Sequence, residues 1–368
     1  DLSSGKVLKT ASCLNPQSGF VSDVLSRIRA CEKKENLNAL TVSVREAING
    51  LIGDEWDVGR MSVAGNATML HLLCGIDPTP IGVAPFTPVF TALKKYRGEE
   101  LGFPVSELVL LPSVSAYVGA DITADILAAD MIGTKENILL IDLGTNGEMA
   151  LSHDGKIVCT STAAGPALEG ACIECGVGGV DGAVNRVWAE GDRIRWSTIG
   201  NKSPVGICGT GLVDLIALLL NRGEIDEAGF LCREKYDVCD GLYLSRADVR
   251  QFQLAKAAVS AGIAALLKKA GIEEKEIDEC FIAGGLGSYM NVESAARTGL
   301  IPGKLKEKTR AVGNGSLYGA QLVLLDRDLQ TEAIDIANQS IAIDLSNDSC
   351  FAEEFIRRMC FDELSEEI

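Results

Sequence analysis

One stretch constrains the fold of this chain more than any other. The apolar run Ile138–Leu143 has Asp142 as its second-to-last residue, and the turn Gly144–Gly147 follows. The run predicts a strand covered on both faces, and Met149–Leu151 predicts a second strand leading out. A carboxylate at a strand end points into a crevice, and glycines let backbone N–H groups approach a phosphate closely. The stretch therefore predicts a metal-and-phosphate corner.

Composition narrows the class of protein. The chain has 368 residues, is 47% hydrophobic and carries a net charge of −17. This length suits two or three packed domains, and neither an apolar run of membrane-spanning length nor a signal peptide is found in the sequence. The acidic balance argues against a nucleic-acid partner and would repel ATP unless N–H groups and a metal compensate. Twelve irregularly spaced cysteines suggest reduced thiols in a cytoplasm.

The two halves of the chain share landmarks in the same order, which indicates an internal duplication. Each half has a hairpin, then a short strand ending in a glycine turn before a helix, then a Tyr-Gly or Val-Gly helix start. The matched pairs are Leu2–Leu8 with Ser152–Val158, Ser62–Ala67 with Phe281–Leu286, and Tyr117–Asp121 with Leu317–Gln321.

The duplication predicts a further corner upstream. Asp142 precedes Gly155 of its hairpin by 13 residues, and the matching position before Gly5 falls before Asp1. We therefore expect a fragment whose first phosphate corner and first strand lie upstream. The alternative is an intact chain whose first repeat has lost the corner.

Local patterns predict a first half over residues 1–130, a second half over 131–330 and a tail over 331–368. The long stretch Asp77–Pro104 is expected to be a loop with little regular structure, and Glu190–Arg193 a hairpin turn. Helices are expected over Ser22–Glu32, Ala39–Gly53, Asn66–Leu73, Ala116–Asp130, Ser245–Gly271 and Asp348–Met359.

Two more glycine corners accompany the first. In Gly206–Leu215 a helix begins near Gly211, and its free N–H groups suit an anion; the alternative is an ordinary glycine turn packed against a neighbour. In Ile282–Ser288 the glycines would let the backbone lie flat against a base or ribose. Each of these two glycine corners is weak evidence by itself for a site that binds a nucleotide. The interpretation therefore rests on the order of the corners along the chain.

That order resembles the superfamily of acetate kinases, sugar kinases, Hsp70 and actin. The resemblance implies an α/β fold in which two ribonuclease-H-like subdomains clamp a nucleotide. Ile141–Glu148 resembles the second phosphate motif and Ile282–Ser288 the adenosine motif. Val118–Ile122 and Tyr318–Leu322 resemble the two connecting helices, and the first phosphate motif would precede Asp1.

Longer strings resemble the reductive activators of corrinoid proteins. They are Asn15–Gln17, Asp23–Ile28, Gly65–Met69, Ala84–Phe86, Val118–Asp121, Ala164–Gly170, Gly206–Gly209 and Asn291. The resemblance implies an ATPase module joined to an iron–sulfur domain, serving corrinoid-dependent methyltransferases and O-demethylases. Such proteins pass one electron to a Co(II) corrinoid, giving Co(I). The implied partners are a corrinoid protein and a donor such as ferredoxin, with a homodimer as a further option. Neither end of this sequence carries a ferredoxin-like cysteine cluster, so the cluster is expected upstream.

The residues suggest these roles. Asp142 would hold Mg²⁺ through water, and either Glu148 or Asp121 would orient the attacking water. Phosphates would contact Gly144, Thr145, Asn146 and Gly147, with Gly209, Thr210 and Gly211 at the second corner. The adenosine would contact Gly284, Gly285 and Leu286.

Other reactive side chains are expected to be structural. Cys172 and Cys175 form a Cys-x-x-Cys without a second pair, so packed thiols are favoured over a cluster. His71 is expected in the core, His153 at a solvated turn, and Arg357–Arg358 on a solvated helix face.

Two other classes of function stay open from sequence. A small-molecule kinase could use the same fold, and so could a nucleotide-gated binding module without turnover.

Overall fold

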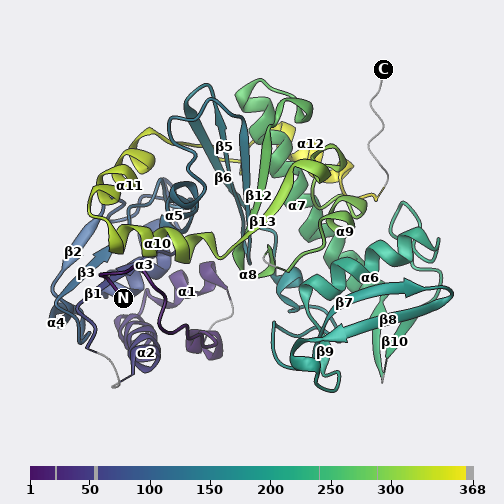
Figure 1. Ribbon diagram of the computed structural model, residues 1–368, viewed down its shortest axis with the longest axis horizontal. Helices are drawn as coiled ribbons and strands as arrows, with labels where there is room; N and C mark the ends of the chain where they lie inside the picture. The colour runs from purple at the N-terminus through teal and green to yellow at the C-terminus, as the bar shows by residue number, and fades with distance from the viewer. Residues whose placement is uncertain (21–22, 54–56, 240, 288, 362–368) are drawn as a thin grey trace. The chain divides into compact units, whose positions relative to one another are not determined.

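The structure is a computed structural model that describes residues 1–368 except 21–22, 54–56, 240, 288 and 362–368. The chain divides into two compact units (Figure 1). The first combines Asp1–Ile132 with Gly315–Ala342, and the second combines Gly133–Asn314 with the chain from Ile343 onward. The predicted domain boundaries at residues 130 and 330 stay predictions. Gly315–Ala342 belongs to the first compact unit.

The first unit contains a small sheet in the order β1-β3-β2, in which β1 is parallel and β2 antiparallel to β3. The strands of the first unit are β1 (Arg60–Val63), β2 (Lys94–Tyr96), β3 (Glu107–Leu110) and, outside this small sheet, β14 (Ile341–Ala342). Its helices are η1 (Pro16–Gly19), α1 (Val24–Ala30), α2 (Lys34–Ile52), α3 (Ala67–Cys74), η2 (Thr79–Ile81), α4 (Gly98–Leu101), α5 (Ala120–Ala128), α10 (Gly315–Leu325) and α11 (Asp328–Gln339).

Side-chain caps fix where the first helices begin. The Asp23 carboxylate accepts the Ser26 N–H at 2.9 Å before α1, and the Asn66 amide oxygen accepts the Met69 N–H at 2.9 Å before α3. Such caps satisfy backbone donors that a helix leaves unpaired. The predicted cap at Asn66 is confirmed, whereas Ser22, the predicted start of α1, lies outside the described residues.

The two helices that were matched as repeats pack against each other. A Cβ at Gly319 of α10 would overlap the backbone of Ala124 in α5, so only glycine allows this close approach. The Ser62 hydroxyl of β1 also donates to the Ala320 carbonyl at 2.6 Å. These contacts place α10 against both α5 and β1.

Two predictions about the first unit are wrong in part. The stretch Asp77–Pro104 contains β2 and α4, because β2 finds a partner in the buried strand β3, which local sequence does not reveal. Leu2–Leu8 forms the expected turn, with the Gly5 N–H donating to the Asp1 carbonyl at 2.9 Å. Its flanks form no strand among the described residues, and an isolated hairpin is marginal in water.

The second unit is built on a sheet whose strands follow the order β13-β12-β4-β5-β6. β4, β5 and β6 form an antiparallel meander, and β12 and β13 add in parallel beside β4. This arrangement fits the predicted ribonuclease-H-like subdomain. The strands are β4 (Ile138–Leu143), β5 (Gly147–His153), β6 (Lys156–Thr162), β12 (Glu279–Ala283) and β13 (Thr309–Gly313).

The other strands of the second unit form two small separate sheets. β7 pairs with β8 and β9, and β10 pairs with β11. α6 packs against β7, as Figure 1 shows. The strands are β7 (Ala183–Glu190), β8 (Arg193–Thr198), β9 (Gly206–Ile207), β10 (Lys235–Cys239) and β11 (Leu242–Ser245). The remaining helices are η3 (Pro166–Glu169), η4 (Ile199–Asn201), α6 (Gly209–Asn221), α7 (Arg246–Ala270), η5 (Glu274–Glu276), α8 (Gly284–Gly287), α9 (Val292–Arg297), η6 (Gly303–Lys308) and α12 (Ser349–Arg357).

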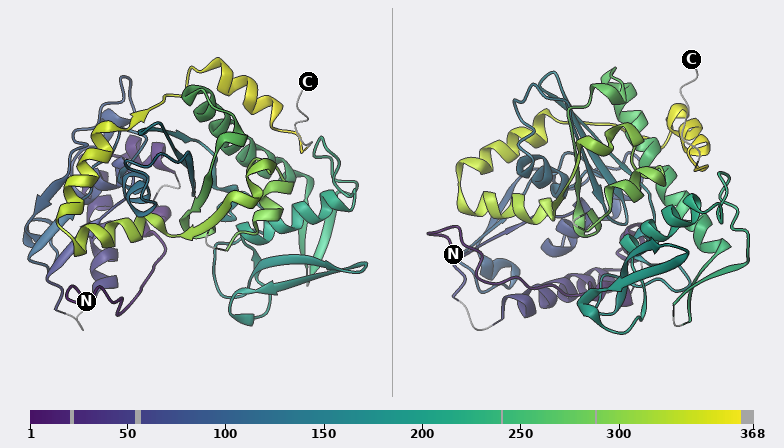
Figure 2. Two further views of the ribbon diagram at one scale, coloured as in Figure 1. Left: turned by 45° about the horizontal axis from the view of Figure 1, so that its top comes forward. Right: turned by 45° about the vertical axis from the view of Figure 1, so that its right-hand side comes forward.

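The long helix α7 covers the sheet and is itself covered by α12 (Figure 2). Ser245 and Asp248 form the predicted capping box at its start, and Gly271 ends it at φ 76°. Its buried side chains, such as Phe252 and Leu266, join the core with Leu139 and Ile141 of β4. Within the described part of the chain, no helix combines the length and apolarity needed to cross a membrane.

His71 of α3 is a core histidine, as predicted. Its side chain is fully buried, with Nδ1 2.7 Å from the Ala67 carbonyl oxygen and Nε2 3.1 Å from the Val89 nitrogen. Because a carbonyl only accepts, Nδ1 carries the proton and Nε2 accepts the Val89 N–H. Burial lowers the pKa of His71, and a second proton on Nε2 would face a donor.

We expect His71 to make stability fall in mild acid. Because its folded-state pKa is lowered, the unfolded chain binds a proton at higher pH than the folded chain. The stabilisation that neutral His71 contributes is fully present above its unfolded-state pKa of about 6.5. It is lost as the pH falls through the folded-state pKa. Urea unfolding at about pH 7.5 and about pH 5.5 should show a smaller loss for His71→Gln than for the natural chain. An equal loss in His71→Gln and in the natural chain would contradict this.

Candidate functional site

Asp142 is the second-to-last residue of β4, and it lies beside Gly284, the first glycine of the corner Ile282–Ser288. In the parallel pairing of β4 with β12, Asp142 lies opposite Ala283, so Gly284 follows beside the carboxylate. Gly284 has φ 88°, and a Cβ there would overlap Asp142 Oδ1 and lie 3.0 Å from the Leu143 carbonyl oxygen. A side chain at Gly284 would therefore displace the Asp142 carboxylate.

The turn after Asp142 sets a second carboxylate beside it. The Gly144 N–H donates to the Asn146 carbonyl at 3.1 Å, and β5 returns antiparallel so that Glu148 pairs directly with Asp142. Side chains of directly opposed residues share one face of a sheet, and like charges in such a pair repel. Glu148 is only 7% exposed. A cation between the two carboxylates would relieve this repulsion, which fits a metal at the corner.

Glu169 is a corner residue that the sequence analysis did not single out. Its Oε2 accepts the Thr145 hydroxyl at 2.7 Å, and a Cβ at Gly144 would lie 4.0 Å from its Oε1. Glu169 ends η3, which lies in the string Ala164–Gly170 that supported the family resemblance. That string was the available signal, but its contact with Thr145 depends on tertiary folding.

The second corner packs against the other two. A Cβ at Gly209 would overlap the Leu168 carbonyl oxygen of η3 and lie 2.6 Å from Leu286 Cδ1 of α8. The start of α6 thus touches both the segment that carries Glu169 and the adenosine motif. The three glycine corners, defined by Gly144, Gly209 and Gly284, therefore converge in the second unit.

Thr210 and Gly211 are used to position α6. The Thr210 hydroxyl is buried and donates to the Asn185 carbonyl at 2.8 Å. A Cβ at Gly211 would overlap the Val184 carbonyl oxygen of β7. These contacts match the alternative of a glycine turn packed against a neighbour. Gly147 likewise packs closely, since a Cβ there would lie 2.9 Å from Thr162 Oγ1.

The adenosine motif has one open glycine. A Cβ at Gly285 would meet nothing within 4 Å, whereas one at Gly287 would lie 2.8 Å from Ile282 Cγ2. Leu286 packs partly buried against the core beside Gly209. Gly285 is thus the position in α8 where the backbone is accessible. Ser288, the predicted end of the motif, lies outside the described residues.

Asp121 belongs to the first unit and is described there alone. It lies in the first turn of α5, and its Oδ1 accepts the Ile122 N–H at 3.1 Å. A Cβ at Gly119 would overlap Asp121 Oδ1 and lie 2.5 Å from Asn66 Cα. The start of α5 therefore packs on the turn between β1 and α3.

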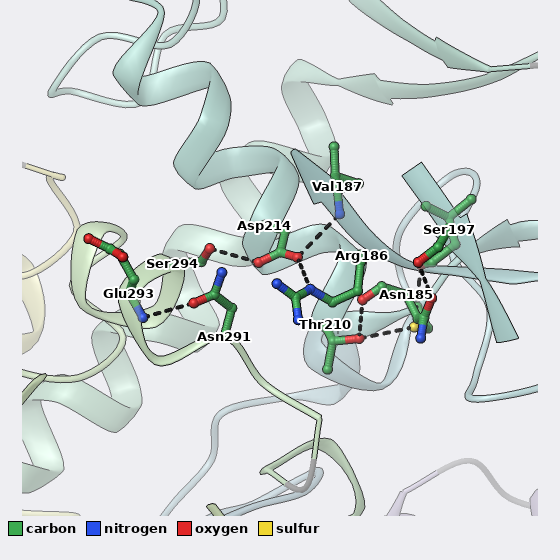
Figure 3. A network of polar contacts seen from close by, with 11 residues as sticks. Asn185, Arg186, Val187, Ser197, Thr210, Asp214, Asn291, Glu293 and Ser294 are labelled. Carbon is green, nitrogen blue, oxygen red and sulfur yellow. Dashed lines mark hydrogen bonds and ion pairs between the residues drawn. The ribbon is translucent and has the colours of Figure 1, made fainter. Parts of the chain in front are cut away.

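An ion pair between the buried Asp214 and the half-exposed Arg186 holds α6 in place (Figure 3). Asp214 Oδ2 accepts Arg186 Nε at 2.9 Å and the Val187 N–H at 3.2 Å, while Oδ1 accepts the Ser294 hydroxyl at 2.7 Å. Asn291 caps α9 by accepting the Glu293 N–H at 3.0 Å. Asp214 therefore joins β7 and α9 to the helix whose first turn forms the second corner.

The cysteines behave as thiols in this structure. Burial raises the pKa of the Cys280 thiol of β12 to about 12, so it is protonated at neutral pH. Cys172 and Cys175 are free cysteines. In the described ranges, no group of three or more His, Cys, Asp or Glu side chains is placed to hold a metal ion.

The fold and corners define a class of protein. Residues 136–367 match the C-terminal domain of RACo, an ASKHA domain, which is the acetate and sugar kinase, Hsp70 and actin class. Residues 1–134 match the RACo middle region. The chain belongs to the RACo family.

Named relatives agree with this membership. The chain is 33% identical to the corrinoid activation enzyme RamQ of Eubacterium limosum, covering 98% of this chain and 67% of RamQ. It is 28% identical to a Co(II) methylated amine-specific corrinoid protein reductase of Methanosarcina barkeri, covering 77% and 59% respectively. A solved structure of a reductive activator for corrinoid, iron–sulfur protein matches with a TM-score of 0.90 at 34% identity, covering 98% of this chain and 63% of that one. The chain thus spans about three fifths to two thirds of the length of these proteins.

Gly284 and Gly285 offer a matched pair of variants. Gly284→Ala should destabilise the second unit by at least about 1–2 kcal/mol, because alanine at positive φ is strained and its Cβ meets Asp142. Gly285→Ala should stay within about 0.5 kcal/mol of the natural chain. Urea unfolding without nucleotide measures both. Similar stability for the two variants would contradict the proposed close approach.

Proposed function

We propose that this chain is the ATP-binding module of a reductive activator that returns an inactive Co(II) corrinoid protein to Co(I). The carrying observation is the convergence of the three glycine corners beside the opposed carboxylates Asp142 and Glu148. The names of the similar proteins support a corrinoid protein as the partner rather than a small-molecule kinase substrate.

The corner residues fit Mg²⁺ and ATP. In the proposal, Asp142 holds Mg²⁺ through water, and the ion neutralises charge on the phosphates. Backbone N–H groups after Gly144, from Thr145 to Gly147, receive the phosphates, while the Thr145 hydroxyl stays hydrogen-bonded to Glu169. The N–H groups at the start of α6 add positive potential. Gly285, which is open, lies against the adenosine.

Several carboxylates are candidates to orient the attacking water. Glu148 lies beside Asp142 in the sheet, and Glu169 contacts Thr145. Asp121 stays a candidate from the first unit. The Thr145–Glu169 hydrogen bond fixes the carboxylate near the phosphate corner, so Glu169 joins the two residues chosen from sequence.

Reduction of the corrinoid requires parts beyond these described residues. In the proposal, a reduced iron–sulfur domain, recharged by a donor such as ferredoxin, passes one electron to Co(II), while ATP and water become ADP and phosphate. The ligands and surroundings of a cofactor tune its reduction potential. In the proposal, closure of the protein on ATP supplies free energy because the open and closed states bind the corrinoid protein with different affinity. A cytoplasmic location and a homodimer belong to the same proposal.

Asp142→Asn should abolish Mg-ATP hydrolysis in the full-length protein and leave the fold intact. The neutral amide loses the charge that holds the ion, so phosphate charge is no longer offset. Circular dichroism and phosphate release measure fold and turnover. The control Asp154→Asn changes the same residue type at the exposed turn between β5 and β6 and should keep activity. Normal turnover in Asp142→Asn would refute the assignment.

The full-length protein should bind a Co(II) corrinoid protein more tightly than the same protein in its Co(I) state, and Mg-ATP should weaken the complex. The preference directs the activator to the inactive state but opposes reduction within the complex, so ATP must supply free energy by weakening that binding. Calorimetry with candidate corrinoid proteins measures the affinities. Transfer of phosphate to a small acid or sugar, with no corrinoid protein bound, would favour the kinase instead.

A further inference from the structure

Tyr289 is the most exposed aromatic residue in the part of the chain that the structure describes, at 72%. Single exposed hydrophobic residues are common on protein surfaces, so exposure alone assigns no role. Tyr289, however, follows α8, the helix that carries the adenosine motif. This place beside the motif distinguishes it from the other exposed aromatic residues.

Two backbone hydrogen bonds fix where Tyr289 leaves α8. Its N–H donates to the Leu286 carbonyl at 3.3 Å, and the Met290 N–H donates to the Gly287 carbonyl at 3.3 Å. Met290 is 7% exposed and belongs to the core of the second unit. Met290 therefore anchors the chain, while Tyr289 beside it stays at the surface next to the end of α8.

The surface beside Tyr289 is accessible and nonpolar. Gly285 is exposed, and a Cβ there would meet nothing within 4 Å. In the parallel pairing of β12 and β13, Ala283 lies opposite Gly313, and the preceding Val312 is 41% exposed. α8 begins directly after Ala283 and packs against β13. An open glycine backbone, an aliphatic side chain and an aromatic ring thus lie at one end of these strands.

These features suit a planar base attached to a phosphate chain. The faces of a nucleobase are apolar, and aromatic side chains bind them by stacking. Gly284 at the start of α8 meets the Asp142 carboxylate, and Leu286 packs beside Gly209 of the second corner. The same short helix therefore connects the phosphate corners to Tyr289.

We infer that Tyr289 holds the adenine of the bound nucleotide by stacking its ring on the base. This assignment rests on the proposed function, because it adds a side chain to the adenosine site of the same nucleotide. A triphosphate without a base offers no face to an aromatic ring. The affinity gained through Tyr289 therefore depends on the base and not on the phosphates.

Calorimetry of the full-length protein with Mg-ATP and with Mg-tripolyphosphate tests the assignment. Tyr289→Ala should weaken ATP binding roughly tenfold, because stacking on the base is lost. Its affinity for tripolyphosphate should equal that of the natural protein. Tyr289→Phe keeps the ring and should bind ATP as the natural protein does. If circular dichroism shows that Tyr289→Ala misfolds, Tyr289→Leu carries the test, since it also lacks the ring.

The matched control is Trp188→Ala. It removes another aromatic ring of the second unit, 46% exposed on β7, and should leave both affinities unchanged.

Several results would overturn the assignment. Unchanged ATP affinity in Tyr289→Ala would do so while leaving the proposed function intact. A tenfold loss in Tyr289→Phe would indicate the hydroxyl instead of the ring. Equal weakening for ATP and tripolyphosphate, or equal weakening in Trp188→Ala, would mean that the substitution acts on the fold or the phosphate corner. If the natural protein bound no Mg-ATP, the proposed function would fail and the assignment with it.

Discussion

The parallel pairing of β4 with β12 is the contact on which the candidate site depends. It sets Ala283 opposite Asp142, so the chain turns at Gly284 directly against the carboxylate. Both strands are buried, and a slip by one residue would reverse which face each side chain occupies. Packing of the core therefore fixes the register, and the register fixes the distance between the phosphate corner and the adenosine motif.

A second constraint keeps α6, the helix of the second glycine corner, in place. α6 begins at Gly209, which fits between Leu168 and Leu286 only because it lacks a side chain. The buried Asp214 carboxylate accepts hydrogen bonds from Arg186 and Ser294 of other elements, so α6 cannot slide without breaking them (Figure 3). The corner is thus held by packing at one end of α6 and by polar contacts further along it.

The sequence predicted features that local rules determine. The strand before Asp142, the caps at Asn66 and Ser245 and the turn at Asp154–Gly155 all follow from short-range pattern and turn chemistry. Features that depend on distant partners were missed. β2 forms because β3 is beside it, and Glu169 reaches Thr145 only after η3 folds against the corner. For the same reason, spacing could not show that Thr210 and Gly211 pack against β7.

The glycine corner would hold a phosphate compound only together with a cation. At the corner, Asp142, Glu148 and Glu169 place negative charge close to the backbone donors. A triphosphate there would meet repulsion unless a divalent cation lay between the oxygens, so the proposed binding of ATP requires a metal.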